Sequence, residues 1–260
     1  MIMGVLNVTP DSFSDGGQFF DVDLAVARGI EMAEQDADII DVGGESARPG
    51  AEPVGAEDEL RRVLPVIEQL RDKIDIPISI DTAKPEVAEA ALAAGASIVN
   101  DVTAGRDPQM LTLIARRKCA CVLMHMQGEP RTMQLAPRYA DVVVEVGEFF
   151  LQQYRRVLDC GIDPMGVAFD PGIGFGKTLA HNLALIRDLV RLRVNDRPLV
   201  IGVSRKSFLS KLIGTPDMSE RTAPTIALTA MLRARGADII RVHDVKENVA
   251  ALRTAEALLK

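Results

Sequence analysis

The chain has 260 residues, of which 47% are hydrophobic, so it is long enough to bury a sizeable core. Lysine and arginine number 30 against 37 aspartates and glutamates, giving a net charge of −7. This charge argues against a nucleic-acid partner, which would require a basic patch. No apolar run approaches the roughly 20 residues of a membrane span, and the apolar start lacks the basic segment of a secretory signal.

The first apolar run, Ile2–Leu6, predicts a buried strand, and a polar loop from Asn7 to Gly17 follows it. Pro10 cannot extend a strand, and the Asp, Ser and Gly residues after it are typical of a loop. Polar loops that directly follow a core strand often bind ligands, so this segment is a candidate ligand loop.

Short apolar runs alternate with helical patterns along the rest of the chain. The expected strands are Ile2–Leu6, Asp38–Val42, Ile78–Asp81, Ser97–Asp101, Ala120–His125, Gly166–Asp170, Leu199–Val203 and Asp238–Val242. The expected helices are 22–36, 57–72, 85–94, 108–117, 139–160, 180–193, 219–235 and 245–259, with a short extra helix starting near Ser204. Eight strand–helix units predict one domain over residues 1–260, a (β/α)8 TIM barrel with its active site at the C-terminal ends of the strands. A doubly wound open sheet is the alternative, but no early Gly-rich dinucleotide turn supports it.

Every expected strand delivers polar residues at its C-terminal end, where the active sites of such barrels lie. One group is cationic or amide-bearing and comes from strands one, seven and eight: Asn7, Lys206, Arg241 and His243. Another comes from strands three, four and six: Asp81, Asn100 and Asp170. Loops after strands seven and eight often bind phosphate, whereas carboxylates suit the donor-rich edge of a flat heterocycle. The pattern predicts a ligand with a hydrogen-bonding ring at one end and phosphate at the other.

Two other motifs do not meet their patterns. The run G-I-G-F-G-K-T from Gly172 to Thr178 resembles a P-loop, but Pro171 occupies the required first Gly position. The histidines His125, His181 and His243 are too scattered for a zinc site, and His181 falls in a helix, where a surface or capping role is favoured.

The cysteines Cys119, Cys121 and Cys160 are odd in number and form no C-x-x-C pair. Buried free thiols are therefore favoured over a disulfide or a zinc site. A reducing cytoplasm fits this pattern.

With these residues in place, the chain resembles the dihydropteroate synthases of folate biosynthesis over nearly its whole length. The resemblance rests on N-V-T-P-D-S-F-S-D-G-G, G-G-E-S-A-R-P-G, S-I-D-T, V-N-D-V, L-M-H-M-Q-G, D-P-G-I-G-F-G-K, S-R-K-S and R-V-H-D-V, all in the family's order. It implies an enzyme that joins 6-hydroxymethyl-7,8-dihydropterin diphosphate to p-aminobenzoate, with release of diphosphate, and that sulfonamides inhibit.

The resemblance also implies roles for individual residues. The pterin pocket would consist of Asp81, Asn100, Asp170 and Lys206. The diphosphate site would consist of Asn7, Arg241 and His243, with Asn7 also a Mg²⁺ ligand, and these three with Lys206 would be the catalytic residues. Ser207 would anchor the p-aminobenzoate carboxylate, and the surroundings of that ring would be Thr9, Pro10, Arg48, Pro49 and Phe175. Met124 is a further substrate-binding candidate, although core packing also explains it.

The family mechanism is dissociative: the electron-rich pterin supports a cationic methylene group, which the arylamine captures. Water would compete for that cation, so the loops Asn7–Gly17 and Ser46–Glu52 are expected to close over the site. A homodimer through outer helices is expected from the same resemblance.

Two departures from the family pattern stand out. Ala47 replaces the usual Thr and removes one hydroxyl contact, and the chain begins almost on the first strand, so the segment that covers the barrel bottom is expected to be short or missing. Two alternatives stay open at this point: a pterin-dependent methyltransferase, which needs no diphosphate site, and a non-catalytic pterin-binding paralogue.

Overall fold

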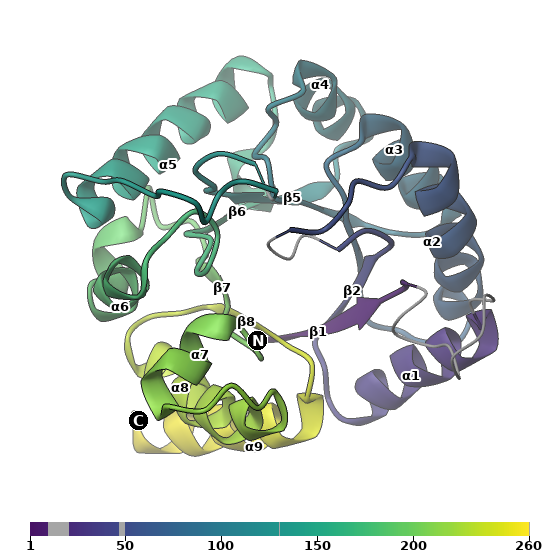
Figure 1. Cartoon of the computed structure of the whole chain (residues 1–260). Helices are drawn as coiled ribbons and strands as arrows, with labels where there is room; N and C mark the ends of the chain where they lie inside the picture. Colours follow the sequence, from purple (N-terminus) through teal and green to yellow (C-terminus); the bar gives the residue numbers. More distant parts are fainter. Residues whose placement is uncertain (10–20, 47–49, 130, 260) are drawn as a thin grey trace.

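The computed structural model describes residues 1–9, 21–46, 50–129 and 131–259, and these form a barrel of parallel strands within a ring of helices (Figure 1). The strands are β1 (Ile2–Asn7), β2 (Ile39–Gly43), β3 (Ile78–Asp81), β4 (Ile98–Asp101), β5 (Ala120–Met124), β6 (Val167–Asp170), β7 (Val200–Gly202) and β8 (Ile239–Val242). Their order in the sheet is β6-β5-β4-β3-β2-β1-β8-β7. A parallel bridge between Phe169 and Leu199 closes the remaining gap. The predicted (β/α)8 barrel is confirmed.

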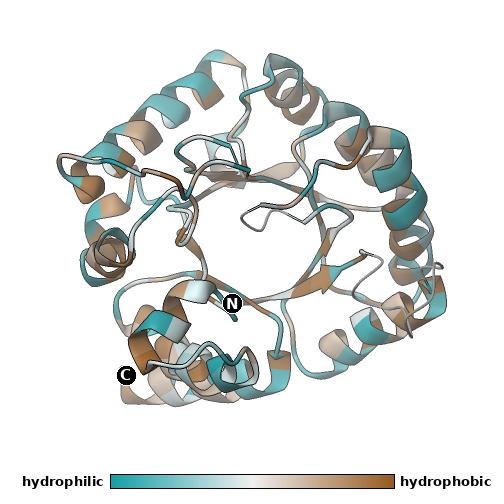
Figure 2. Ribbon diagram, in the orientation of Figure 1, coloured by the Kyte–Doolittle hydropathy of each residue, from teal (hydrophilic) through white to brown (hydrophobic). Residues whose placement is uncertain are grey.

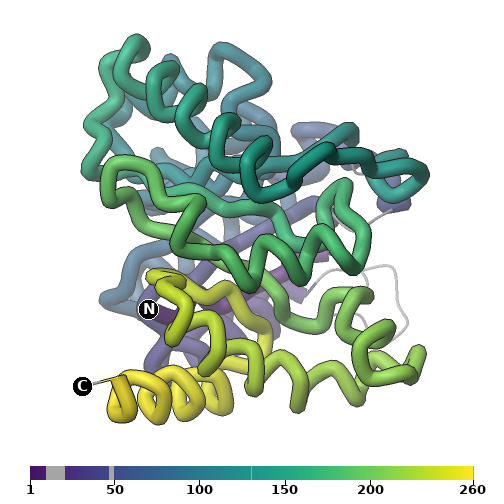
Figure 3. Tube along the Cα trace, turned by 90° about the vertical axis from the view of Figure 1, so that its left-hand side faces the viewer, coloured from purple at the N-terminus to yellow at the C-terminus, as the bar shows by residue number. Residues whose placement is uncertain are grey.

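The helices return the chain along the outside of the barrel. They are α1 (Val22–Glu34), α2 (Ala56–Arg71), α3 (Pro85–Ala94), α4 (Pro108–Arg117), α5 (Val142–Asp159), α6 (Leu179–Arg187), α7 (Ser207–Ile213), α8 (Thr222–Ala234) and α9 (Val245–Leu258). Three short 3₁₀ segments accompany them: η1 (Pro164–Gly166), η2 (Leu189–Leu192) and η3 (Ser219–Arg221). The side view places both termini at one end of the barrel (Figure 3). Because strand β1 starts there, the loops that follow the strands gather at the opposite end.

Three helix boundaries differ from the sequence prediction for local reasons. Helix α5 begins at Val142 because the Asp141 side chain accepts from the backbone N–H groups of Val143 and Val144, which caps the helix. The expected helix 180–193 divides at Asp188 into α6 and η2. Helix α7 begins at Ser207 and not near Ser204, because Arg205 has a φ of 57°, which an α-helix cannot contain.

Strand alternation separates two sets of buried side chains. Outward-facing residues such as Ile40, Ile80 and Phe169 pack in the main core beneath the helices. Helix α2 shows the amphipathic pattern clearly: its apolar residues face the sheet and most of its charged residues face outward (Figure 2). Inside the barrel, a small apolar layer is formed by Met3, Ile39, Val122, Ala168 and Val200.

The next inward-facing layer is mostly polar. Two positions beyond Ile39, Ile98, Val122, Ala168, Val200 and Ile239 lie Asp41, Asn100, Met124, Asp170, Gly202 and Arg241. The period-two geometry of a strand therefore carries these side chains to the mouth at the strands' C-terminal ends.

Within the described ranges, no helix is long and apolar enough to cross a membrane. The three cysteines are free, as expected. However, Cys160 is exposed, so the expectation of buried thiols is wrong for that residue, which caps the C-terminus of α5.

Replacing Phe150 by Ala should destabilise the barrel, because Phe150 stacks on Phe169 at 4.8 Å between ring centroids and both are fully buried. We expect the free energy of unfolding in urea to fall by about 3–5 kcal/mol. Leu135→Ala is the control, because Leu135 is 82% exposed. A Phe150→Ala loss no larger than that of the control would contradict this account of the core.

Candidate active site

Arg241 on β8 reaches across the barrel mouth to carboxylates on two other strands, β2 and β3. Its Nε donates to Oδ2 of Asp41 on β2 at 2.5 Å, and its Nη2 donates to Oδ2 of Asp81 on β3 at 2.6 Å. Oδ2 of Asp41 also accepts from Nδ2 of Asn100 on β4 at 3.0 Å. Asp41 therefore fixes both the guanidinium and the side-chain amide of Asn100.

Burial controls the protonation of this cluster. It raises the pKa of Asp81 to about 7, although the Arg241 charge opposes the shift. Burial also acts to lower the pKa of Arg241, but the carboxylates of Asp41 and Asp81 outweigh it, and that pKa lies above its usual value. Arg241 thus stays charged while facing the mouth.

A second cation lies across the mouth, next to Asp170 on β6. Nζ of Lys206 donates to the carbonyl oxygen of Ile173 at 2.5 Å and lies 4.5 Å from the centroid of the Phe175 ring. Burial lowers the pKa of Lys206 to about 8, and Asp170 opposes this shift. Asp170 is itself buried, which raises its pKa, and its Oδ1 accepts from the backbone N–H of Gly172 at 2.7 Å.

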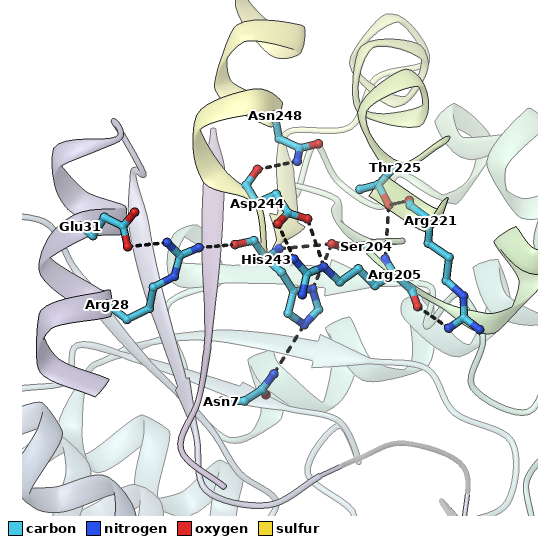
Figure 4. A network of polar contacts seen from close by, with 10 residues as sticks. All are labelled: Asn7, Arg28, Glu31, Ser204, Arg205, Arg221, Thr225, His243, Asp244 and Asn248. Atoms are coloured by element: carbon cyan, nitrogen blue, oxygen red, sulfur yellow. Dashed lines mark hydrogen bonds and ion pairs between the residues drawn. The ribbon is translucent and has the colours of Figure 1, made fainter. Parts of the chain in front are cut away.

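The ends of β1, β7 and β8 meet at His243, as Figure 4 shows. Nε2 of His243 lies 3.5 Å from Nδ2 of Asn7, and its Nδ1 lies 3.0 Å from Oγ of Ser204. The backbone N–H of His243 also donates to that hydroxyl at 3.2 Å. Behind this group, Arg205 forms an ion pair with Asp244. Asn7, near the start of the chain, and His243, near its end, thus lie in contact at one edge of the mouth.

The structure gathers at the barrel mouth most of the residues that the sequence singled out. The residues that line the mouth are Asn7, Asp81, Asn100, Met124, Asp170, Phe175, Lys206, Arg241 and His243. Thr9 follows β1, and Ser207 is the first residue of α7. Outside the described residues lie Pro10, Ala47, Arg48, Pro49 and most of the expected covering loop Asn7–Gly17.

Sequence reasoning missed Asp41. The sequence carries a signal for this residue, because a carboxylate stands inside the apolar run I-I-D-V-G. Asp41 lies within its strand, however, and a prediction based on strand ends does not include it. It also missed a cluster at the root of the second loop, where Nζ of Lys84 contacts Glu45 and the fully buried Glu59. No spacing in the sequence links these three residues, since only the barrel brings them together.

The histidines behave differently from one another. His181 caps α6: its backbone N–H donates to Oγ1 of Thr178 at 3.2 Å, and its Nδ1 accepts from the Thr178 N–H at 3.3 Å. The predicted capping role is confirmed. His125 is buried beside Lys177, away from the contacts of His243.

The fold and the polar mouth are those of a pterin-binding barrel, and a family model described as pterin binding enzyme matches residues 3–243. A curated dihydropteroate synthase of Escherichia coli K12 is 46% identical over 99% of this chain and 91% of its own length. One from Synechocystis is 45% identical over 99% of this chain and 89% of its own length. The chain therefore belongs to the dihydropteroate synthase family.

Solved structures agree with this assignment. Xanthomonas albilineans dihydropteroate synthase with 4-aminobenzoic acid matches with a TM-score of 0.93 and 46% identity, over 99% of this chain and 92% of that one. The same organism's enzyme in complex with 7,8-dihydropteroate matches with a TM-score of 0.90 and 43% identity, over 99% of this chain and 93% of that one. A Yersinia pestis dihydropteroate synthase with a sulfonamide drug matches with a TM-score of 0.94 and 42% identity, over 99% of this chain and 94% of that one.

Replacing Arg241 by Met should leave Asp41 and Asp81 as two adjacent buried carboxylates without their cation. We expect a loss of about 3–5 kcal/mol in the free energy of unfolding at pH 7.5. Burial already raises the pKa of Asp81 to about 7 against the opposing charge of Arg241. Without that charge, the folded pKa of Asp81 lies still further above its unfolded value, so the folded state binds more protons. Stability should consequently recover as the pH falls toward 5.5.

Urea unfolding at both pH values measures this effect. Arg253→Met is the matched control, because it breaks an ion pair with Asp36 in which both side chains are more than half exposed. An Arg241→Met variant as stable as this control at pH 7.5 would contradict the described role of Arg241.

Proposed function

We propose that the protein condenses 6-hydroxymethyl-7,8-dihydropterin diphosphate with p-aminobenzoate to give 7,8-dihydropteroate and diphosphate. The observation that carries this proposal is the division of one barrel mouth into a carboxylate–amide side and a cationic side that share Arg241. Membership of the dihydropteroate synthase family supports it. So do the 4-aminobenzoic acid and the 7,8-dihydropteroate bound by the Xanthomonas albilineans relative.

For the pterin ring, we assign recognition to Asp81, Asn100, Asp170 and Lys206. Carboxylates accept hydrogen bonds from the ring N–H groups, and burial strengthens such bonds. Asp41 accepts from Asn100 and so fixes the orientation of that amide before the ring arrives. A preorganised edge of this kind favours a flat heterocycle with several donors.

For the diphosphate, we assign Asn7, Arg241 and His243, with Mg²⁺ as the cofactor. Within the described ranges, no group of three or more His, Cys, Asp or Glu residues could hold a metal ion. A site with one amide oxygen, from Asn7, fits an ion that arrives with the phosphate oxygens of the substrate. When bound, Mg²⁺ supplies charge neutralisation for the departing diphosphate.

The step we propose breaks the C–O bond between the pterin methylene and the diphosphate, and the electron pair leaves on the phosphate oxygen. Arg241 and His243 stabilise the charge that develops there. The amine of p-aminobenzoate then donates its lone pair to the methylene carbon, and its N–H proton passes to the released diphosphate. We assign its ring to the wall formed by Phe175, Met124 and Thr9, and its carboxylate to Ser207. Sulfonamides would compete for the same place.

Neither alternative function gains support. A pterin-dependent methyltransferase has no need for the cations at the phosphate end, and the relatives described above are dihydropteroate synthases. The proposed setting is the cytoplasm, which suits three free cysteines, and the homodimer through outer helices stays a prediction.

Purified protein supplied with Mg²⁺, the pterin diphosphate and p-aminobenzoate should release diphosphate and form 7,8-dihydropteroate. Asp170→Ala should weaken pterin binding in calorimetry by roughly 10- to 100-fold, because a buried hydrogen-bonding partner of the ring is lost. Asp36→Asn, at an exposed carboxylate, is the control. Absence of product at every magnesium concentration would refute the enzyme proposal, and unchanged affinity of the Asp170 variant would refute the pocket assignment.

The rate should also depend on the charge of Lys206. Because burial lowers the pKa of its ammonium group to about 8, the charged form is lost as the pH rises through that value. We expect kcat/KM for the pterin diphosphate to decline above pH 8, and the decline to move to higher pH in Lys206→Arg, whose guanidinium stays protonated. An identical basic limb in both proteins would show that another group is responsible.

A further inference from the structure

Lys177 is a buried cation that the proposed reaction does not use. It is the second-last residue of the run that resembles a P-loop, and only 2% of the residue is exposed. Its Nζ lies within hydrogen-bonding distance of three acceptors. These are Nδ1 of His125 at 3.0 Å, the carbonyl oxygen of His125 at 3.3 Å and the carbonyl oxygen of Phe175 at 3.0 Å.

The hydrogen bonds of this group fix the state of His125. Burial lowers the pKa of Lys177 to about 7, so its ammonium form prevails below that pH. An ammonium group has three N–H donors and no acceptor, so three acceptors satisfy it fully. Nδ1 of His125 must then present its lone pair, which leaves the ring neutral with its proton on Nε2. Burial, together with the nearby charge of Lys177, lowers the pKa of His125 to about 3, in agreement with a neutral ring.

Lys177 joins the loop after β5 to the loop after β6, and the two loops also meet backbone to backbone. Gly172 and Gly176 have φ values of 65° and 60°. A Cβ at Gly172 would lie 2.0 Å from the carbonyl oxygen of His125, and one at Gly176 would lie 2.4 Å from that of Gln127. Only glycine fits at either position, so the loops form one packed unit.

This unit carries groups that hold Lys206. The carbonyl of Ile173 accepts from Nζ of Lys206, and the ring of Phe175 lies beneath the same ammonium group. The backbone of Phe175 is in turn held by Lys177 from the buried side. Lys177 and Lys206 therefore both contact the short segment from Ile173 to Phe175.

We propose that Lys177, with His125 as its acceptor, is a positioning residue that sets the Phe175 wall for the aryl substrate. This inference rests on the proposed function, because the aryl substrate is p-aminobenzoate. Of the residues assigned to the pterin, Asp81 and Asn100 come from β3 and β4, outside this unit, whereas Asp170 and Lys206 contact it at Gly172, Ile173 and the Phe175 ring. Lys177 binds the backbone of Phe175 directly, so the wall for the aryl substrate is the part of the mouth nearest to the lost bond. Loss of the Lys177–His125 bond should therefore affect p-aminobenzoate more than the pterin diphosphate.

The test compares His125→Asn with His125→Leu. Asn and Leu match in size and branching, and both remove the imidazole ring with its edge contact to Phe149. Asn can place an oxygen near the position of Nδ1, whereas Leu offers no acceptor. We expect His125→Leu to raise the KM for p-aminobenzoate roughly tenfold, which corresponds to one hydrogen bond, with a much smaller change for the pterin diphosphate. His125→Asn should restore most of that loss.

Equal KM values for p-aminobenzoate in the two variants, or parallel rises for both substrates, would overturn the proposal. A second measurement needs neither variant nor activity. The chain has three histidines, so ¹⁵N spectra of the wild-type protein can report their tautomers. At pH 6, where Lys177 is charged and His125 is neutral, His125 should show an unprotonated Nδ1. A protonated Nδ1 would refute the inference even in an active enzyme, whereas an inactive wild type with the expected tautomer would refute the proposed function alone.

Discussion

The forked ion pair of Arg241 with Asp41 and Asp81 is the interaction on which the rest of the site depends. It joins β8 to β2 and β3 across the interior of the barrel, and through Asp41 it extends to Asn100 on β4. A buried guanidinium without these carboxylates, or the carboxylates without it, would be strongly destabilising. The same geometry that satisfies the buried charges therefore presents one cation and several acceptors to the mouth in fixed positions.

The charges of the mouth then explain what kind of ligand it suits. Three carboxylates, Asp41, Asp81 and Asp170, face two cations, Arg241 and Lys206. The carboxylate acceptors lie on one side of the mouth. Asn7 and His243 lie on the other side, which also has the Arg241 guanidinium. A neutral ring rich in N–H donors with an anionic tail matches both sides at once, and neither a free phosphate nor an uncharged heterocycle does. Loop positioning by Lys177 and Lys206 supplies a separate place for a second, aromatic reactant.

Much of this could be predicted from the sequence, for identifiable reasons. The strands are short apolar runs, and parallel barrels place functional groups at their C-terminal ends, so Asn7, Asp81, Asn100, Asp170 and Arg241 could be found by position alone. Asp41 could not be found that way, because it lies inside its strand and acts by facing inward. The cluster of Glu45, Glu59 and Lys84 and the pair of His125 and Lys177 arise from contacts between separate units, which no local pattern records. The start of α7 was misplaced because the positive φ of Arg205 has no signature in its residue type.

The central claim is that the fork of Arg241 ties pterin recognition to the diphosphate end. Calorimetry can test it by measuring the affinities of 6-hydroxymethyl-7,8-dihydropterin with and without its diphosphate, in the wild type and in Arg241→Lys. Lysine keeps the charge but cannot bridge two carboxylates and still present N–H donors to a phosphate. The account predicts that the preference for the diphosphate form falls at least roughly tenfold in the variant, the equivalent of about 1.4 kcal/mol. An undiminished preference in a folded variant would contradict it.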